Sequence, residues 1–453
     1  MDAYLPFTLR QKMKKPNIVY YHSHDTGRYI QPYGYQVPTP NLQKLAEEGV
    51  VFRKAFCTSP TCSPSRAGLF TGSASHSVGM LGLAHRGFAL DDYSKTLVGV
   101  LNQAGYATVL CGVQHIVPHE ELDQLGYEKL LLNEPSPNAE NASSRAVEFL
   151  RERDPDRPFF LDVGVFETHR YQSKKHLNGA FHPDGVQGDG CYVRPPEPIP
   201  DMAETRQDWA DYCASAQRMD EGLGRVRREL EAQGIVEDTI IVYTTDHGPA
   251  FPHMKCTLSD YGIQVALIVR FPGAKYGGRV EGGLISHADV LPSLCEMIGT
   301  KAPFPVQGKS WMPLLDENMA IRKHVFAEIN YHAVDNAMRC VRTDRYKLIR
   351  RYVNNPDAVI RCCDMSLSKD AFLQAGWDRW TRSDVEFYDL VLDPTESCNL
   401  ADEESYGEVR TLLERELDRW MIDTDDPLLG EIHASSDDVK GRFSGILTQQ
   451  ERG

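Results

Sequence analysis

Residues 239–248 read TIIVYTTDHG, an apolar, β-branched run that ends in Asp246, His247 and Gly248. Residues 17–25 repeat this pattern as NIVYYHSHD, again with polar side chains directly after an apolar run. Near-continuous apolar runs of this length are typical of strands that are buried on both faces of a parallel sheet. The two stretches therefore predict the centre of an α/β fold with polar groups at the strand ends.

Outward from these stretches, apolar runs alternate with amphipathic segments of helical length. The further predicted strands cover residues 107–111, 159–165 and 265–271. The predicted helices cover residues 39–49, 94–105, 143–153 and 204–234. This alternation predicts a mostly parallel sheet sandwiched between helices.

The pattern changes near residue 320. Short strand-like runs follow one another without long helices between them, at residues 325–329, 337–343, 346–352 and 385–389. We therefore predict two domains, an α/β catalytic domain over residues 1–320 and a smaller α+β domain with an antiparallel sheet over residues 321–453. Within the first domain, residues 171–200 are rich in Gly and Pro and are expected to form a long functional loop.

The composition is that of a globular protein with an acidic surface. Of the 453 residues, 41% are hydrophobic and 25% are charged, which excludes a disordered or collagen-like chain. The net charge of −15 is opposite to the charge that a protein binding a nucleic-acid backbone needs. We expect no nucleic-acid partner, whereas a small anionic substrate is compatible with this charge if positive groups gather in one cleft.

The sequence contains no apolar run long enough to span a membrane. Residues 1–15 are basic but lack the apolar segment of a secretory signal. The 11 cysteines are scattered and odd in number, which is typical of reduced thiols inside a cell. We expect a cytoplasmic protein without a membrane partner, and the sequence leaves open a homo-oligomer.

Four predicted strands deliver polar residues to one edge of the sheet. Ligands of open parallel sheets bind outside the carboxyl ends of the strands. The residues that follow the strands are His24 and Asp25, Asp246 and His247, His169 and Arg170, and His115. A single histidine at a strand end is usually structural, but four such strands together favour a functional site.

Asp25 and Asp246 each stand beside a histidine, and carboxylate plus imidazole is a plausible shell for a divalent metal. The two aspartates supply hard oxygen donors. His24 and His247 are softer donors, whereas Ca²⁺ prefers oxygen ligands. The alternative, that both histidines only form hydrogen bonds near the ligands, stays open at this point.

Residues 61–72 read TCSPSRAGLFTG, in which Ser63, Pro64 and Ser65 indicate a turn into a helix. A group at such a helix start faces the positive end of the helix dipole, which suits an anion or a nucleophile. Cys62 is therefore a candidate nucleophile. The alternative is a buried structural thiol.

These residues also carry a family resemblance. Residues 60–72 resemble the sulfatase signature, in which the cysteine of Cys-x-Pro-Ser-Arg is oxidised to formylglycine, and residues 105–115 resemble the second signature of that family. The likeness extends over nearly the whole chain and is closest to heparan N-sulfatase (sulfamidase)-like members. It implies an alkaline-phosphatase-like fold and a formylglycine-dependent hydrolase of a sulfate ester or sulfamate. It also implies a maturation enzyme as a partner and one divalent metal, usually Ca²⁺, with Mn²⁺ or Zn²⁺ as alternatives.

The resemblance further implies roles for single residues. Cys62 becomes the formylglycine whose hydrate is the nucleophile, and Arg66 holds that hydrate. His115 stands beside the hydrate, His169 beside the leaving group, and Lys255 contacts the sulfate. The implied metal-ligand positions are occupied by His24, Asp25, Asp246 and His247.

Two more residues are candidates for substrate binding. Arg170, next to His169, is placed to bind an anionic group of the substrate, and the alternative is a structural ion pair. His332, near the start of the second domain, is placed to reach the cleft, and the alternative is a position on the surface.

The chain departs from the family pattern at two places. The family's Asp-Asp pair is His24-Asp25 here, and a sulfate-binding lysine is replaced within residues 112–115, which read GVQH. Phosphonate monoester and phosphodiester hydrolases share the formylglycine and vary at these places, so they are the alternative function. A non-enzymatic protein is disfavoured by the intact Cys62–Arg66 run. In every enzymatic case residue 62 must lie within about a dozen ångströms of Asp25 and Asp246, because reacting groups have to meet.

Overall fold

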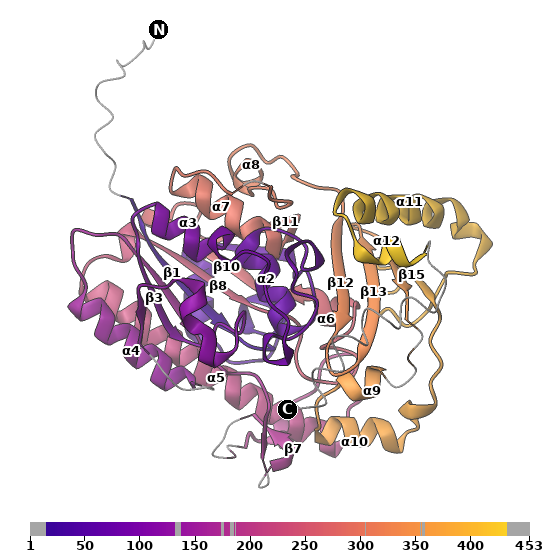
Figure 1. The fold of residues 1–453 in the computed structure, drawn as a ribbon. Helices are drawn as coiled ribbons and strands as arrows, with labels where there is room; N and C mark the ends of the chain where they lie inside the picture. Colours follow the sequence, from indigo (N-terminus) through magenta and orange to yellow (C-terminus); the bar gives the residue numbers. More distant parts are fainter. Residues whose placement is uncertain are drawn as a thin grey trace.

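A computed structural model describes residues 15–432, apart from 132–136, 174–175, 182–184, 186, 304, 354 and 356–357. Its larger part is a nine-stranded sheet between layers of helices, and its smaller part is a four-stranded sheet (Figure 1). The strands of the large sheet are β1 (Asn17–Ser23), β2 (Val50–Phe56), β3 (Ala107–Gly112), β4 (Lys129–Leu130), β5 (Phe159–Gly164), β8 (Thr239–Thr245), β9 (Gln264–Val265), β10 (Leu267–Arg270) and β11 (Arg279–Ser286).

The large sheet has the order β11-β2-β10-β8-β1-β5-β3-β4, and β9 pairs with β2. The neighbours from β8 to β4 are all parallel, which confirms the mostly parallel sheet. The run at residues 265–271 differs from the expectation, because β10 lies antiparallel to both β8 and β2. β2 was not predicted, since Arg53 and Lys54 interrupt its apolar pattern.

Helices cover both faces of the large sheet. They are α1 (Pro40–Glu48), α2 (Cys62–Thr71), α3 (Leu97–Gln103), α4 (Ala139–Glu152), α5 (Ala203–Ala232), α6 (Asp260–Ile263), α7 (Val290–Met297) and α8 (Met312–Asp316). Successive residues of a strand point to opposite faces, so Tyr20 of β1 packs in one core with α2 and α3. Tyr21 packs in the other core with α4 and α5. In the described part of the chain, no helix has the length and apolar character needed to cross a membrane.

The smaller part is the predicted antiparallel sheet. Its strands, in spatial order, are β12 (Val325–Tyr331), β13 (Asp335–Arg342), β14 (Tyr346–Arg351) and β15 (Val385–Asp389). The helices of this part are α9 (Ala358–Cys362), α10 (Leu367–Gln374), α11 (Gly407–Asp423) and α12 (Pro427–Ile432). Ile329 and Met338 belong to the core that includes Tyr20, whereas the other face of the small sheet packs under α11. The predicted boundary at residue 320 lies between α8 and β12 and stays a prediction.

The segment at residues 171–200 is not entirely a loop. It contains a short antiparallel hairpin of β6 (Tyr171–Ser173) and β7 (His176–Ala180). The 11 cysteines all lie in the described part of the chain, and each is a free thiol.

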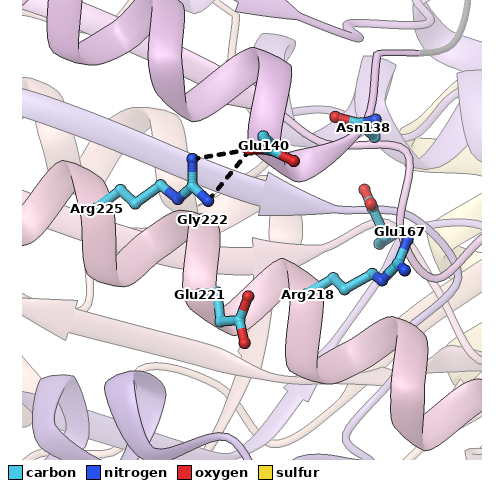
Figure 2. A pocket seen from close by; sticks show the side chains of 7 residues that line it. All are labelled: Asn138, Glu140, Glu167, Arg218, Glu221, Gly222 and Arg225. Atoms are coloured by element: carbon cyan, nitrogen blue, oxygen red, sulfur yellow. Dashed lines mark hydrogen bonds and ion pairs between the residues drawn. The ribbon is translucent and has the colours of Figure 1, made fainter.

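A small polar pocket of about 290 Å³ lies where α4 and α5 meet (Figure 2). Arg218 and Arg225 of α5 line it, and Arg225 contacts Glu140 of α4 at 3.4 Å. Glu167, from the loop after β5, also lines it, and burial raises the pKa of Glu167 to about 7. Acidic and basic groups are mixed here, so this pocket does not provide the concentrated positive charge that a small anion needs.

A buried polar network ties the two sheets together through Glu328 of β12. Its carboxylate accepts hydrogen bonds from the Ser75 hydroxyl at 2.8 Å and from the backbone N–H and Nδ1 of His76 at 3.0 and 2.8 Å. Arg339 of β13 lies 3.5 Å from the same carboxylate and pairs with Asp426. Although burial lowers it, the Glu328 carboxylate raises the pKa of His76 above its ordinary value.

Replacing Glu328 in the variant Glu328→Gln should lower the free energy of unfolding by about 3 kcal/mol, because breaking a buried pair leaves a charge without its partner. Urea denaturation measures this change. The ion pair between Glu328 and His76 contributes to the free energy of unfolding only while His76 is protonated. The loss of unfolding free energy in Glu328→Gln should therefore be largest below about pH 6.5 and become smaller as the pH rises through the raised pKa of His76. Glu148→Gln, in an exposed ion pair with Arg145, is the control and should cost less than about 1 kcal/mol. Equal losses in both variants would contradict the role of the network.

Candidate active site

Cys62 is the first residue of α2, and every residue of this helix is buried. The helix lies close to the segment after β2, because a Cβ on Gly68 would stand only 2.1 Å from Oγ1 of Thr58. The Ser65 hydroxyl donates a hydrogen bond of 2.5 Å to the backbone carbonyl of Asp246. Packing and this hydrogen bond therefore hold the start of α2 against the end of β8.

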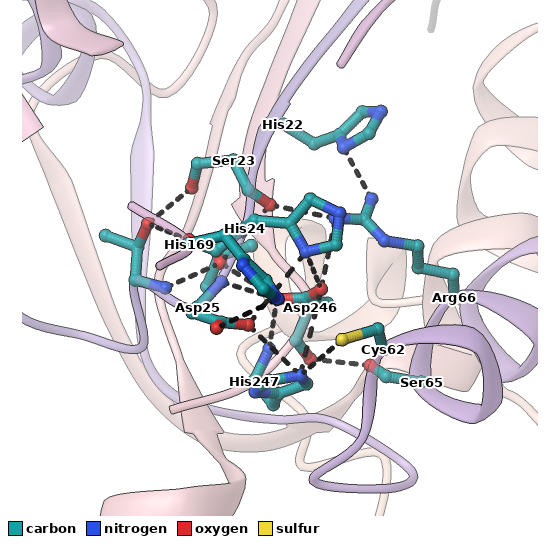
Figure 3. A network of polar contacts seen from close by, with 12 residues as sticks. His22, Ser23, His24, Asp25, Cys62, Ser65, Arg66, His169, Asp246 and His247 are labelled. Atoms are coloured by element: carbon teal, nitrogen blue, oxygen red, sulfur yellow. Dashed lines mark hydrogen bonds and ion pairs between the residues drawn. The ribbon is translucent and has the colours of Figure 1, made fainter. Parts of the chain in front are cut away.

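The ends of β1 and β8 bring two aspartates and two histidines together next to Cys62 (Figure 3). Nδ1 of His24 lies 2.8 Å from Oδ2 of Asp246, and Nε2 of His247 lies 3.4 Å from Oδ1 of Asp25 and 3.3 Å from the Cys62 sulfur. One ligand atom from each of His24, Asp25, Cys62 and Asp246 lies within 4.8 Å of all the others. Residue 62 therefore lies within about a dozen ångströms of Asp25 and Asp246, as the predicted chemistry requires.

The turns after β1 and β3 are strained. Asp25 has a φ of 50° and His115 a φ of 59°, in the left-handed region that side chains other than glycine rarely adopt. The backbone N–H of Asp25 donates a hydrogen bond of 2.8 Å to Oδ1 of Asp246. Strain of this kind persists only where surrounding contacts hold it, and it clusters at functional sites.

The donors fit a divalent cation. Among the described residues, the buried Nε2 of His24 has no hydrogen bond, while the buried Nδ1 of His24 and Oδ1 of Asp25 form no well-aligned hydrogen bond and lie 2.8 Å from Oδ2 of Asp246 and 3.4 Å from Nε2 of His247. Burial raises the pKa of Asp25, but the Lys255 ammonium and then His169 and His247 together lower this pKa to well below its ordinary value. Ionised carboxylates and imidazole lone pairs that face one another without other partners form a metal-ligand set. His24, Asp25 and Asp246 are therefore placed to hold a metal ion, with His247 beside them.

Arg66 is fixed by a chain of buried groups. Its Nη2 donates to Oδ2 of Asp246 and to the Ser23 carbonyl, both at 3.1 Å, and its Nη1 contacts Nδ1 of His22 at 2.6 Å. An arginine can only donate, so Nδ1 of His22 accepts and its Nε2 donates to Asp162 at 2.9 Å. Burial, and then the charge of Arg66, lower the pKa of His22 to about 4, so this ring stays neutral.

His22 and Asp162 are site residues that were not predicted from the sequence. The available signal was a carboxylate inside the apolar strand β5 and a histidine inside β1. Adjacent parallel strands bring the two side chains together, since β1 pairs directly with β5.

Lys255 lies at the centre of a second set of contacts. Its Nζ is 2.8 Å from Oδ2 of Asp25, 3.2 Å from Asp364 and 3.4 Å from Nε2 of His169. Although burial lowers it, the carboxylates of Asp25 and Asp364 raise the pKa of Lys255 well above its ordinary value, so Lys255 is charged. Asp364, which follows α9 in the smaller part, was also missed from the sequence.

His169 is neutral in the free protein, because burial lowers its pKa to about 4. Its Nδ1 lies 2.7 Å from the backbone carbonyl of Arg170 and donates to it. The neutral ring therefore presents an acceptor at Nε2, toward Lys255.

His115 stacks on His85 with ring centroids 5.6 Å apart and stands 5.3 Å from the His24 ring. Burial, and then the nearby His24 and Arg66, lower the pKa of His115 well below its ordinary value. The preceding Gln114 turns its amide onto the backbone of its own loop, with both hydrogen bonds to Val117 at 3.0 Å. This loop consequently brings no positive charge to the site.

The two predicted substrate-binding residues have different surroundings. Arg170 forms two hydrogen bonds with Asp208, at 2.7 and 2.9 Å, and its guanidinium lies over the ring of Phe181. It thus occupies the structural ion pair that the sequence left as its alternative. His332 is buried rather than on the surface, and burial, followed by the charge of Lys255, lowers its pKa to about 3.

Two family models match the chain. The model described as Sulfatase matches residues 16–300, which is well over half of the chain. The model described as N-sulphoglucosamine sulphohydrolase, C-terminal, matches residues 253–365.

Known proteins align over most of the chain. The N-sulphoglucosamine sulphohydrolase of Homo sapiens is 28% identical over 438 residues, covering 86% of this chain and 86% of that protein. An ulvan-active sulfatase of Formosa agariphila is 27% identical over 469 residues, covering 90% of this chain and 75% of that protein.

Solved structures share the fold. One, in complex with its substrate D-glucosamine-2-N,6-O-disulfate, matches with a TM-score of 0.71 and 20% identity, covering 91% of this chain and 99% of that chain. The phosphonate monoester hydrolase of Agrobacterium radiobacter matches with a TM-score of 0.66 and 20% identity, covering 90% and 96%. At these identities the likeness shows the fold alone, which confirms the alkaline-phosphatase-like architecture.

Adding a divalent cation to metal-stripped protein should raise its melting temperature, because a ligand that binds only the folded state stabilises it by about 2.7 kcal/mol at a hundredfold excess over Kd. Asp246→Asn should lose most of this increase, since it removes one negative charge from the donor set. Thermal denaturation with and without MnCl₂ or CaCl₂ measures the effect. Asp344→Asn, at an exposed position, is the control and should keep the full increase. An equal increase in both variants would place the cation elsewhere.

Proposed function

This chain belongs to the sulfatase family and is a sulfuric ester hydrolase, and we propose that it removes the sulfate group from a sulfated amino sugar, with N-sulfated glucosamine as the preferred substrate class. The observation that carries the proposal is the position of Cys62, whose sulfur lies within 4.8 Å of ligand atoms of His24, Asp25 and Asp246. The match of residues 253–365 to the C-terminal model of N-sulphoglucosamine sulphohydrolase supports the substrate class.

The nucleophile is proposed to arise from Cys62. Burial raises the pKa of the Cys62 thiol well above its ordinary value, so the unmodified side chain is a neutral thiol and a poor nucleophile. Conversion to formylglycine by a maturation enzyme removes this problem. The hydrated aldehyde supplies one oxygen for attack on sulfur and a second oxygen that expels the sulfate when the aldehyde re-forms.

Two cations of the chain are proposed to bind the sulfate. Arg66 and Lys255 are both buried beside Cys62, and they contrast with the net charge of −15 of the whole chain. Fixed positive groups in a water-poor site stabilise the charge that develops during transfer without having to reorganise. His22 and Asp162 hold Arg66 in its orientation, whereas His115 is proposed to accept a hydrogen bond from the hydrate, and His332 to contact the sugar.

The proposed metal ligands are His24, Asp25 and Asp246, with His247 next to them. A bound divalent cation would polarise the nucleophile and a sulfate oxygen. Ca²⁺, the ion implied by the family resemblance, takes oxygen ligands, and carboxylates also suit Mn²⁺, whereas imidazole suits ions such as Zn²⁺. The carboxylates of Asp25 and Asp246 therefore suit Ca²⁺ or Mn²⁺, whereas the imidazole of His24 suits Zn²⁺.

His169 is proposed to donate a proton to the amine or alkoxide that leaves. The free protein keeps His169 neutral, but protonated Lys255 stands 3.4 Å from its Nε2. An entering sulfate adds negative charge next to His169 and favours its protonated form. His169 can then donate a proton from Nε2 to the leaving group.

A phosphonate monoester hydrolase is the alternative function. The feature that favours it is Val113, which replaces the family's sulfate-binding lysine, because phosphonate monoester and phosphodiester hydrolases that share the formylglycine vary at this place. Sulfate monoesters and phosphonate monoesters each carry one negative charge near neutral pH, so the charge of the site does not separate them. Rates of the purified enzyme on an aryl sulfate and on a phenyl phosphonate decide between the two.

The Cys62 peptide of protein made together with a maturation enzyme should have lost one sulfur and two hydrogen atoms and gained one oxygen, as measured by mass spectrometry. Cys62→Ala should reduce kcat to background, by a factor on the order of 10⁶ for loss of a nucleophile. Cys398→Ala, at an exposed cysteine, is the control and should retain wild-type activity. Full activity of protein with an unmodified Cys62 would exclude the proposed nucleophile.

His169→Ala should lower kcat on glucosamine 2-N-sulfate by about 10²–10⁴-fold, the usual contribution of a general acid. The loss on 4-nitrophenyl sulfate should be much smaller, since its leaving group departs without a proton. Steady-state kinetics on both substrates measure the two losses, and His324→Ala, at a partly exposed histidine away from the site, is the control. Losses of the same size on both substrates would refute the acid role of His169.

A further inference from the structure

A second pocket of about 430 Å³ lies between the segment that follows β8 and the small sheet. Its volume falls within the range of small-ligand sites. Neither Lys255 nor any proposed metal ligand lines it. His253 does line it, however, only two residues before Lys255, so their Cα atoms are at most about 7.6 Å apart. One short segment thus places Lys255 in the proposed active site and His253 in this pocket.

Aromatic rings form one wall of the pocket. The His253 ring lies 5.4 Å from Phe372, 5.3 Å from Trp377 and 5.4 Å from Trp380, centroid to centroid. Trp380 is 63% exposed, which is unusual for so large an apolar side chain. A flat, accessible indole beside a cavity offers a face on which a ring-shaped ligand can pack. Hydroxyl groups of Thr395 and Ser397 line the same cavity and can hydrogen-bond to such a ligand.

Arg382 gives the pocket a positive charge that Glu386 opposes without forming an ion pair with it. In the described part of the chain Arg382 has no hydrogen bond or ion pair, although it is only partly exposed. Burial, and then the like charge of Arg351, lower the pKa of Arg382 to about 10, so it remains protonated at neutral pH. A partly buried cation without a hydrogen-bonded partner has lost part of its hydration, and an anionic ligand would offset that cost.

Each carboxylate of the pocket is engaged through at least one oxygen, whereas Oε2 of Glu396 has no hydrogen bond among the described residues. Glu386 accepts a hydrogen bond of 2.7 Å from Arg351 and one of 3.2 Å from the Tyr388 hydroxyl. Glu396 accepts one of 2.9 Å from Lys347. Arg382 is therefore the group of this pocket that is available to an anion.

We propose that this pocket binds a second, anionic sugar ring of the substrate chain, with its carboxylate or sulfate on Arg382 and its ring against Trp380. This inference rests on the proposed function, because it extends a sulfated amino sugar to an oligosaccharide whose neighbouring units carry negative charge. The enzyme would then prefer longer anionic oligosaccharides to the monosaccharide.

The test uses full-length metal-loaded enzyme and two probes, glucosamine 2-N-sulfate and a tetrasaccharide of alternating N-sulfoglucosamine and uronate. For each variant, kcat/KM on the tetrasaccharide is divided by kcat/KM on the monosaccharide. We expect this ratio to fall at least tenfold in Arg382→Ala and in Trp380→Ala, and to recover in part in Arg382→Lys. Arg419→Ala, at an exposed arginine of α11, is the control and should keep the wild-type ratio. Unchanged ratios in both pocket variants would overturn the proposal.

Calorimetric binding of the tetrasaccharide to Cys62→Ala protein separates this inference from the proposed function. If the wild-type enzyme hydrolyses neither probe, the proposed function fails. The pocket proposal is still supported in that case if the double variant Cys62→Ala/Arg382→Ala binds the tetrasaccharide more weakly than Cys62→Ala alone. If hydrolysis occurs but binding is equal with and without Arg382, the pocket proposal fails alone. Trp380 lies at the surface, so Trp380→Ala keeps the test open even if Arg382→Ala does not fold.

Discussion

The structure depends on two buried carboxylates, Asp25 and Asp246, that are held close together. Adjacent parallel strands impose this arrangement, because β1 and β8 pair with Ser23 opposite Thr245, so the residues that follow both strands emerge side by side. Two negative charges in a buried site repel strongly unless cations offset them. Arg66 from α2 and Lys255 from the segment after β8 meet this need, and the same cations suit an anionic substrate.

The site contains residues from both the larger and the smaller part of the fold. Asp364 and His332 come from the smaller part of the chain, and Asp364 shares Lys255 with Asp25. The pairing of Lys255 with two carboxylates keeps it charged in spite of its burial. Pairing also explains the contrast between two other arginines: Arg170 is matched by Asp208, whereas Arg382 has no such partner in the described part of the chain.

Much of the fold could be predicted, because strand-forming runs with polar ends and amphipathic helices have different periods in the sequence. The direction of β10 could not, since an apolar run looks the same in parallel and antiparallel sheets. Cys62 and Asp246 were predicted because they follow local signals, a helix start and a strand end. His22 and Asp162 were missed, since their importance arises from a pairing between strands that lie 140 residues apart.

The sequence by itself determined the order of strands and helices, the motif around Cys62 and the supply of Asp, His and Arg at strand ends. These features are local, because side-chain periodicity and turn residues act over a few neighbouring positions. Only the tertiary structure decided which charges meet, that Arg170 is used in an ion pair, and that Arg382 faces a cavity. Electrostatic energy depends on distance and burial, and both are set by packing between segments that are far apart in the chain.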